Sequence, residues 1–303
     1  MTQPAVHSCF EPATSTWQYV VADPATGAAV IIDPVLDFDP ARNFISTASA
    51  DALLALVKHN GYTVERLLET HAHADHLTAA KYLQHRLSEV GKKPDICIGK
   101  RITEVQERFG RRYGIARDEY KGVFDKLFDD DEVFNVGQFE AKAVHLPGHT
   151  PDHLGYLIGD NVFCGDSLFN ADVGSARCDF PGGDAHKLYN SVTAKLFSLP
   201  PNHKIYTGHD YPPAGRDRPQ ASMTVAQQKE RNKHLKAGTS EDDFVRWRAE
   251  RDSSLAEPQL IHQALQLNIR AGALPLPSTT GGEGRGSDRL LHVPVKVEGG
   301  RVW

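Results

Sequence analysis

The chain has 303 residues, a formal net charge of −5 and a pI near 6.3, with 40% hydrophobic and 24% charged residues. These values are ordinary for a globular protein with a sizeable core, and they lack the basic excess of a nucleic-acid-binding protein. No apolar run approaches the roughly 20 residues that cross a bilayer, and the first residues lack the basic and apolar regions of a secretory signal. We therefore expect a cytoplasmic protein that binds neither nucleic acid nor membrane.

The cysteine pattern agrees with a reducing compartment. The four cysteines are scattered, and none forms a Cys-x-x-Cys pair. This spacing argues against a disulfide framework and against a structural zinc knuckle. We expect each to be a small buried hydrophobic residue. They are Cys9, Cys97, Cys164 and Cys178.

The first part of the chain is rich in predicted strands. Two β-rich runs flank the turn signal Asp23–Gly27, which predicts a hairpin. An apolar run that ends at Asn60-Gly61 predicts a helix capped by Ser49 or Asp51. In chain order we predict strands at 16–22 and 28–32, a helix at 52–59, a strand at 64–70, a helix at 77–87, a strand at 95–99, and helices covering the site within 101–128.

The later part repeats strand and turn signals and then becomes polar. Residues 133–144 alternate around Gly137 as a hairpin does, and Asp184 can cap the following helix. A tail of amphipathic helices ends in a loop rich in Gly, Pro, Ser and Thr. We predict strands at 155–158, 162–164 and 204–207, helices at 185–197, 224–235 and 242–255, and a loop at Pro275–Asp288.

The distribution of these elements predicts an α/β fold in one domain. Polar residues recur where strands end, which suits two packed sheets with helices outside. We predict a catalytic core at 1–215. The extension at 216–303, made of helices and loops, should pack on the same domain as a covering layer.

A histidine and aspartate cluster carries the chemistry. In the segment His71-Ala72-His73-Ala74-Asp75-His76, alternate side chains of an extended segment share one face, so two imidazoles can point into one site. Three further groups each follow a glycine, which lets the backbone approach closely. Any one of these residues alone is more often structural, but together they predict a site for iron, zinc or manganese. The three downstream groups are His149, Asp166 and His209.

This constellation resembles the metallo-β-lactamase superfamily. Asp33, which follows the strand at 28–32, fits an early aspartate of that family. The resemblance extends from about Trp17 to Tyr211. It implies an αβ/βα sandwich of two mixed β-sheets flanked by helices, with the metal at the upper edge of the sheets.

The flanking residues are most similar to the persulfide dioxygenase branch, especially its bacterial members. Ser175 departs from the pattern, since some members have a cysteine there that is not a ligand. The segments that carry the resemblance are Phe10-Glu11-Pro12, Ile32-Asp33-Pro34-Val35-Leu36, Gly165–Phe169, Gly174–Asp184, His209-Asp210-Tyr211 and Asn268–Gly272.

The resemblance implies that glutathione persulfide, O2 and water give glutathione and sulfite. It implies one Fe(II) per chain on His71, His149 and Asp166, a set of two histidines and one carboxylate that leaves open positions for substrate and oxygen. The remaining members of the cluster would orient these ligands through hydrogen bonds, or would hold a second metal if the site carries two zinc ions. They are His73, Asp75, His76 and His209.

Three residues are candidates for substrate binding. Arg177 can pair with a carboxylate of glutathione, although an ion pair with Asp179 or Asp184 explains it equally simply. By the same resemblance Tyr211 can donate its hydroxyl, and Arg270 is a third candidate. The carrier thiol stays open between glutathione, coenzyme A and other small thiols, and a homodimer is possible.

Two other functions compete with this interpretation. A dinuclear zinc thioester hydrolase of the glyoxalase II type uses the same seven residues. A metal-binding sensor or interaction module is a non-enzymatic alternative, but such a module needs no open metal position. The nucleic-acid-processing branch normally adds a domain and a basic surface, and this chain shows neither.

Overall fold

The structure is a computed structural model, and it describes residues 3–277 and 289–294. Most of the predicted loop at Pro275–Asp288 lies outside these described residues. Among the helices of the described ranges, none combines the length and apolar character needed to span a bilayer.

The first sheet has six strands in the order β1-β2-β3-β6-β8-β9. The pairs β1–β2 and β2–β3 are antiparallel, and the pairs from β3 to β9 are parallel, so the sheet is mixed. Its strands are β1 (Ala5–Glu11), β2 (Thr16–Ala22), β3 (Ala28–Ile32), β6 (Thr63–Leu68), β8 (Asp95–Gly99) and β9 (Lys126–Phe128).

The second sheet also has six strands, in the order β10 to β15. Only the β13–β14 pair is parallel. A small three-stranded sheet has the order β5-β4-β7. The strands are β10 (Val133–Val136), β11 (Phe139–His145), β12 (Leu154–Ile158), β13 (Asn161–Phe163), β14 (Lys204–Tyr206), β15 (Ser222–Thr224), β4 (Val35–Asp39), β5 (Phe44–Ser46) and β7 (Leu77–Thr78).

Strand β2 shows how the sequence separates the layers. Successive side chains of a strand point to opposite faces. Tyr19 and Val21 therefore join the core between the two sheets, where the ring of Tyr19 lies 5.0 Å from that of Phe163 in β13. Val20 and Ala22 join the core on the other face of the first sheet. Each such buried side chain larger than alanine contributes roughly 1.5–3 kcal/mol.

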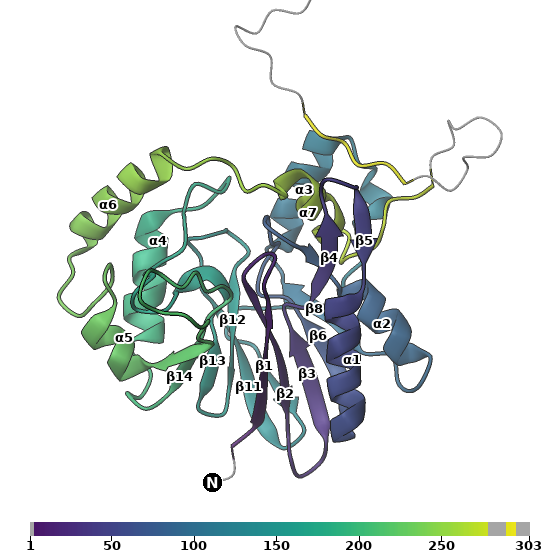
Figure 1. Cartoon of the computed structure of the whole chain (residues 1–303), viewed down its shortest axis with the longest axis horizontal. Coiled ribbons are helices and arrows are strands. Elements are labelled where there is room, and N and C mark those ends of the chain that lie inside the picture. Colours follow the sequence, from purple (N-terminus) through teal and green to yellow (C-terminus); the bar gives the residue numbers. More distant parts are fainter. Residues whose placement is uncertain (1–2, 278–288, 295–303) are drawn as a thin grey trace, which may run out of the picture.

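Helices cover the outer face of both sheets, which confirms the predicted αβ/βα sandwich (Figure 1). The outer core of the first sheet contains residues of α1 (Ala48–Asn60), α2 (Ala80–Ser88), α3 (Ile102–Tyr113) and α7 (Ile261–Asn268). The outer core of the second contains residues of α4 (Ala185–Asn190), α5 (Val225–Arg231), α6 (Glu241–Ser253) and the π-helical turn Ser191–Leu196.

Three predictions about local structure were wrong, each because tertiary contacts decided the outcome. The helix predicted from Leu77 begins at Ala80, since Leu77 and Thr78 pair with β4 instead. Helix α1 begins after Thr47, while Ser49 donates its hydroxyl to Asp37. Within 101–128 only α3 is an α-helix, and it packs on the first sheet rather than over the site.

The residues from 216 onward contribute to several layers. Strand β15 extends the second sheet, α6 packs on α4, and α7 packs on α3 and β7. The division into a core at 1–215 and an extension at 216–303 stays a prediction.

Candidate metal centre

The predicted site residues gather at one edge of the two sheets. His71 and His73 lie in the loop after β6, His149 lies between β11 and β12, Asp166 follows β13, and His209 follows β14. Strand β2 is joined to the loop after β14 at this edge, where the backbone N–H of Trp17 donates to the carbonyl oxygen of Gly208 at 2.8 Å. The ends of separate strands therefore converge as the sequence predicted.

Glycines allow this convergence. Gly165 has φ +48, and a Cβ there would lie 2.6 Å from the hydroxyl of Thr70. A Cβ at Gly208 would lie 2.5 Å from a carboxylate oxygen of Asp166. Real side chains do not tolerate such distances, so both positions require glycine.

The first group consists of His71, His149 and Asp166, which we call the His71 group. One potential ligand atom of each lies within 4.8 Å of the others, and all three residues are buried. His149 Nε2 lies 3.6 Å from Asp166 Oδ2. The structure thus brings together the three residues that the sequence predicted as iron ligands.

Hydrogen bonds fix the imidazoles of this group. His149 Nδ1 lies 2.7 Å from the carbonyl oxygen of Arg177 and donates to it, which leaves the lone pair on Nε2. His71 Nδ1 lies 3.0 Å from the hydroxyl of Thr70, and that hydroxyl donates to Asp33 at 2.9 Å. Such outer partners orient a histidine and select its tautomer for metal binding.

The protonation state of His71 also suits a ligand. Burial holds the pKa of His71 well below its ordinary value, and the neighbouring imidazoles of His73 and His153 lower it further. The ring is therefore neutral at pH 7 and has a free lone pair. Within the described residues, His71 Nε2 and Asp166 Oδ1 are buried and have no hydrogen-bond partner.

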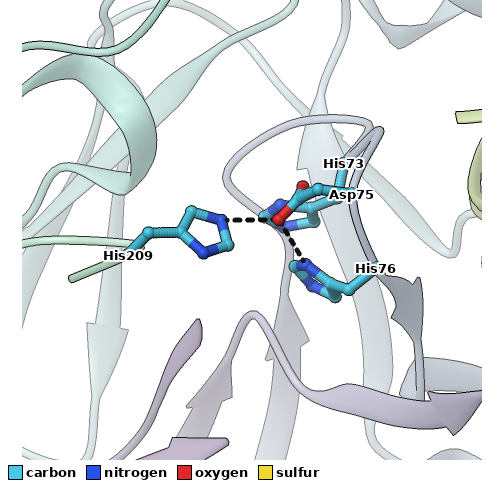
Figure 2. Close-up of side chains that lie close together, drawn as sticks. All are labelled: His73, Asp75, His76 and His209. Carbon is cyan, nitrogen blue, oxygen red and sulfur yellow. Dashed lines mark ion pairs between the residues drawn. The ribbon is translucent and has the colours of Figure 1, made fainter. Parts of the chain in front are cut away.

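The second group consists of His73, Asp75, His76 and His209, which we call the Asp75 group (Figure 2). Asp75 Oδ2 lies 3.1 Å from His209 Nε2 and 3.6 Å from His76 Nδ1. Asp166 Oδ2 lies 3.6 Å from His209 Nε2, so Asp166 connects the two groups. This arrangement can hold a second metal ion or orient the ligands of a single one.

Two residues at this site were not predicted as site residues from the sequence. Glu69 is buried, and its Oε2 lies 3.5 Å from His73 Nε2, which also lies 3.1 Å from Asp33 Oδ1. The side chain of Asn268 donates to the carbonyl oxygens of His73 and His76 at 2.8 Å each. The sequence signal for Glu69 is its place two residues before His71. Asn268 lies 192 residues from His76, and only the family resemblance of the segment Asn268–Gly272 pointed to it.

The site opens into a cavity of ≈ 620 Å³. His149, Asp166 and Asp75 line one part of it, and much of the remaining wall comes from α6 and the segments beside it. Lys233 and Arg251 line it without a carboxylate within ion-pair distance among the described residues. A volume of this size fits a small organic substrate.

The three predicted substrate residues differ in position. Arg177 and Tyr211 line the cavity, but the guanidinium of Arg177 makes two 2.5 Å hydrogen bonds to Asp179. Arg270 is buried elsewhere, where it bonds to Glu119 at 2.8 Å and to the carbonyl of Gln266 at 2.7 Å. Arg270 is not among the residues that line the cavity, and its role in substrate binding stays a prediction.

Comparisons with known proteins agree with the fold. Residues 12–209 match the model of the metallo-beta-lactamase superfamily, and the chain therefore belongs to that superfamily. The superfamily consists mostly of hydrolases.

Curated relatives carry names from two kinds of enzyme. A beta-lactamase hydrolase-like protein of Xylella fastidiosa is 43% identical over 99% of this chain and 67% of the relative. A protein named glyoxylase B2 of Dictyostelium discoideum is 40% identical over 86% of this chain and 89% of the relative. The mitochondrial persulfide dioxygenase ETHE1 of Bos taurus is 31% identical over 89% of both chains.

Among solved structures, ETHE1 from Myxococcus xanthus superposes with a TM-score of 0.69 and 29% identity, covering 89% of this chain and all of that one. Persulfide dioxygenases are thus among the relatives of this chain, beside a hydrolase-like group.

Proposed function

We propose that the protein is a persulfide dioxygenase that oxidises glutathione persulfide with O2 and water to sulfite and glutathione, using one Fe(II). The observation that carries this proposal is the His71 group, in which two imidazoles and one carboxylate converge at the edge of an open cavity. Two histidines and a carboxylate with open positions form the usual site of non-haem Fe(II) oxygenases.

The buried atoms of the site fit a metal ion. His71 Nε2 and Asp166 Oδ1 lack a hydrogen-bond partner in the described part of the chain, and burying such atoms unsatisfied costs about 1–3 kcal/mol each. A cation bound by His71, His149 and Asp166 removes this cost. When bound, a ferrous ion supplies the electrons that activate dioxygen.

Side chains that line the cavity determine which substrate binds beside the metal. Lys233 and Arg251 place positive charge along the cavity, which suits an anionic substrate such as glutathione. Arg177 lines the same cavity while its guanidinium is bonded to Asp179, so it must exchange that partner to bind substrate. The carboxylates of Asp75 and Asp166 line the same cavity within the metal-binding groups. This combination suits a substrate whose sulfur binds at the metal and whose carboxylates pair with the basic side chains.

A dinuclear zinc thioester hydrolase is the second candidate function. The Asp75 group favours it, since its four potential ligand atoms also lie within 4.8 Å of one another and would hold a second ion beside Asp166, whose Oδ2 lies 3.6 Å from His209 Nε2. The two relatives at 40% and 43% identity, named for glyoxylase and hydrolase activity, also favour it. A metal-binding sensor is a weaker third candidate, because it has no use for a substrate cavity beside the metal.

A paired assay separates these functions. Protein purified without oxygen is given glutathione persulfide, and oxygen uptake and sulfite are measured. The same preparation is given lactoylglutathione, and thioester cleavage is followed. We expect sulfite formation and negligible cleavage. Cleavage without oxygen uptake would assign the hydrolase instead.

A further inference from the structure

His153, which the sequence analysis did not single out, lies beside the His71 group. It is fully buried, directly before β12. Its ring stacks on that of His71, with centroids 4.6 Å apart and planes inclined by 22°. A buried ring that packs on a predicted ligand can hold that ligand in its orientation.

The nitrogen atoms of His153 reach the loop of a second ligand. The backbone N–H of Asp166 donates to His153 Nε2 at 3.0 Å. The ring proton must then be on Nδ1, which lies 3.4 Å from the hydroxyl of Ser167. His153 thus contacts one ligand through its ring face and the backbone of another through its edge.

The segment around His153 also links the ligand loops through its neighbours. Asp152 accepts the backbone N–H of Ala72, between His71 and His73, at 2.9 Å. The backbone of Leu154 donates to Thr70 at 2.7 Å. The hydrogen bonds of Asp152 and Leu154 therefore fix the backbone on either side of His153. Its ring can then hold His71 and the backbone of Asp166 in place.

We infer that His153 is a positioning residue that sets the separation of His71 and Asp166 and thereby the affinity of the site for its metal. The inference rests on the proposed metal site but not on the reaction performed there. Partners that orient metal ligands typically change affinity by about 10- to 100-fold when they are lost.

Two substitutions separate the two contacts. His153→Phe keeps a ring against His71 but removes the acceptor for the N–H of Asp166. His153→Gln keeps an acceptor within reach and removes the ring. Ile158→Ala is the control, because Ile158 is equally buried in β12 but packs in the core between the sheets.

The readout is the binding of Co(II) to metal-free full-length protein, measured by chelator competition together with the visible absorption of bound cobalt. We expect His153→Phe to weaken binding by about 10- to 100-fold and to shift the absorption band, and His153→Gln to restore part of the affinity. Ile158→Ala should lower the melting temperature and leave both cobalt readouts unchanged.

Wild-type affinity and absorption in His153→Phe would overturn the inference, as would an equal loss of affinity in Ile158→Ala. If neither His153 variant folds, Ser167→Ala tests how the ring of His153 is oriented by removing the partner of Nδ1, and an unchanged cobalt spectrum there counts against the inference. Because cobalt binding needs no persulfide, failure of the proposed reaction leaves this test intact.

Discussion

The His71 group and the Asp75 group contain similar residues but differ in how their side chains are held. In the first group, Thr70 and the carbonyl of Arg177 each hold one ring nitrogen and leave the other free. In the second, both nitrogens of His76 lack a hydrogen-bond partner among the described residues, and His73 Nε2 faces two carboxylates. The difference suggests that the His71 group is preorganised for a metal and that the Asp75 group supports it.

The strongest test of this difference between the two groups is to remove one carboxylate from each. Asp166→Ala should abolish iron binding and sulfite formation, because it removes a ligand. Asp75→Ala should retain most of the iron and lose only part of the activity. Metal analysis and turnover of both variants check this. Equal metal loss in the two would support a dinuclear site.

Thr70→Val tests the preorganisation of His71. The change removes the hydroxyl between His71 and Asp33 at nearly constant volume. We expect metal affinity to fall by about 10- to 100-fold, as for other partners of metal-binding histidines. Chelator competition measures this affinity. The matched control is Thr16→Val, which removes the hydroxyl beside His209 in the Asp75 group. A larger loss of metal affinity in Thr16→Val than in Thr70→Val would show that the Asp75 group, and not the His71 group, is the preorganised one.

Arg177→Ala tests the cavity side of the His71 group. The substitution keeps the backbone carbonyl that accepts from His149, so iron content should stay at the wild-type level. It removes positive charge from the cavity, and we expect KM for glutathione persulfide to rise by about 10-fold, or 1.4 kcal/mol. Asp179→Asn, which frees the guanidinium, is the control and should leave KM equal or lower. An unchanged KM in Arg177→Ala would exclude the side chain from substrate binding.

Asn268→Ala tests how the loop of the Asp75 group is held. It leaves the carbonyls of His73 and His76 and the N–H of Thr78 without their side-chain partner. We expect a loss of about 3 kcal/mol or more in the free energy of unfolding, since three buried groups lose their partner and each unsatisfied group costs about 1–3 kcal/mol. Denaturant unfolding measures it. Activity per bound iron should change little, and a collapse of that ratio would show that the second group acts directly.

The sequence predicted the layers and the convergence of the ligands because both follow from local patterns. The β-rich runs on either side of the turn at Asp23–Gly27, glycine before Asp166 and His209, and the spacing of His71 and His73 are visible in a few residues each. Arg270, Asn268 and His153 could not be placed in this way, since their partners lie far along the chain and burial alone decides their contacts. The edge strand β7 was missed for the same reason, because only its pairing with β4 defines it.

Anomalous diffraction at the iron and zinc absorption edges, on crystals of protein purified without oxygen, tests the central claim most directly. The account predicts a single iron peak between His71, His149 and Asp166, and none among His73, Asp75, His76 and His209. Two zinc peaks, one in each group and bridged by Asp166, would contradict it.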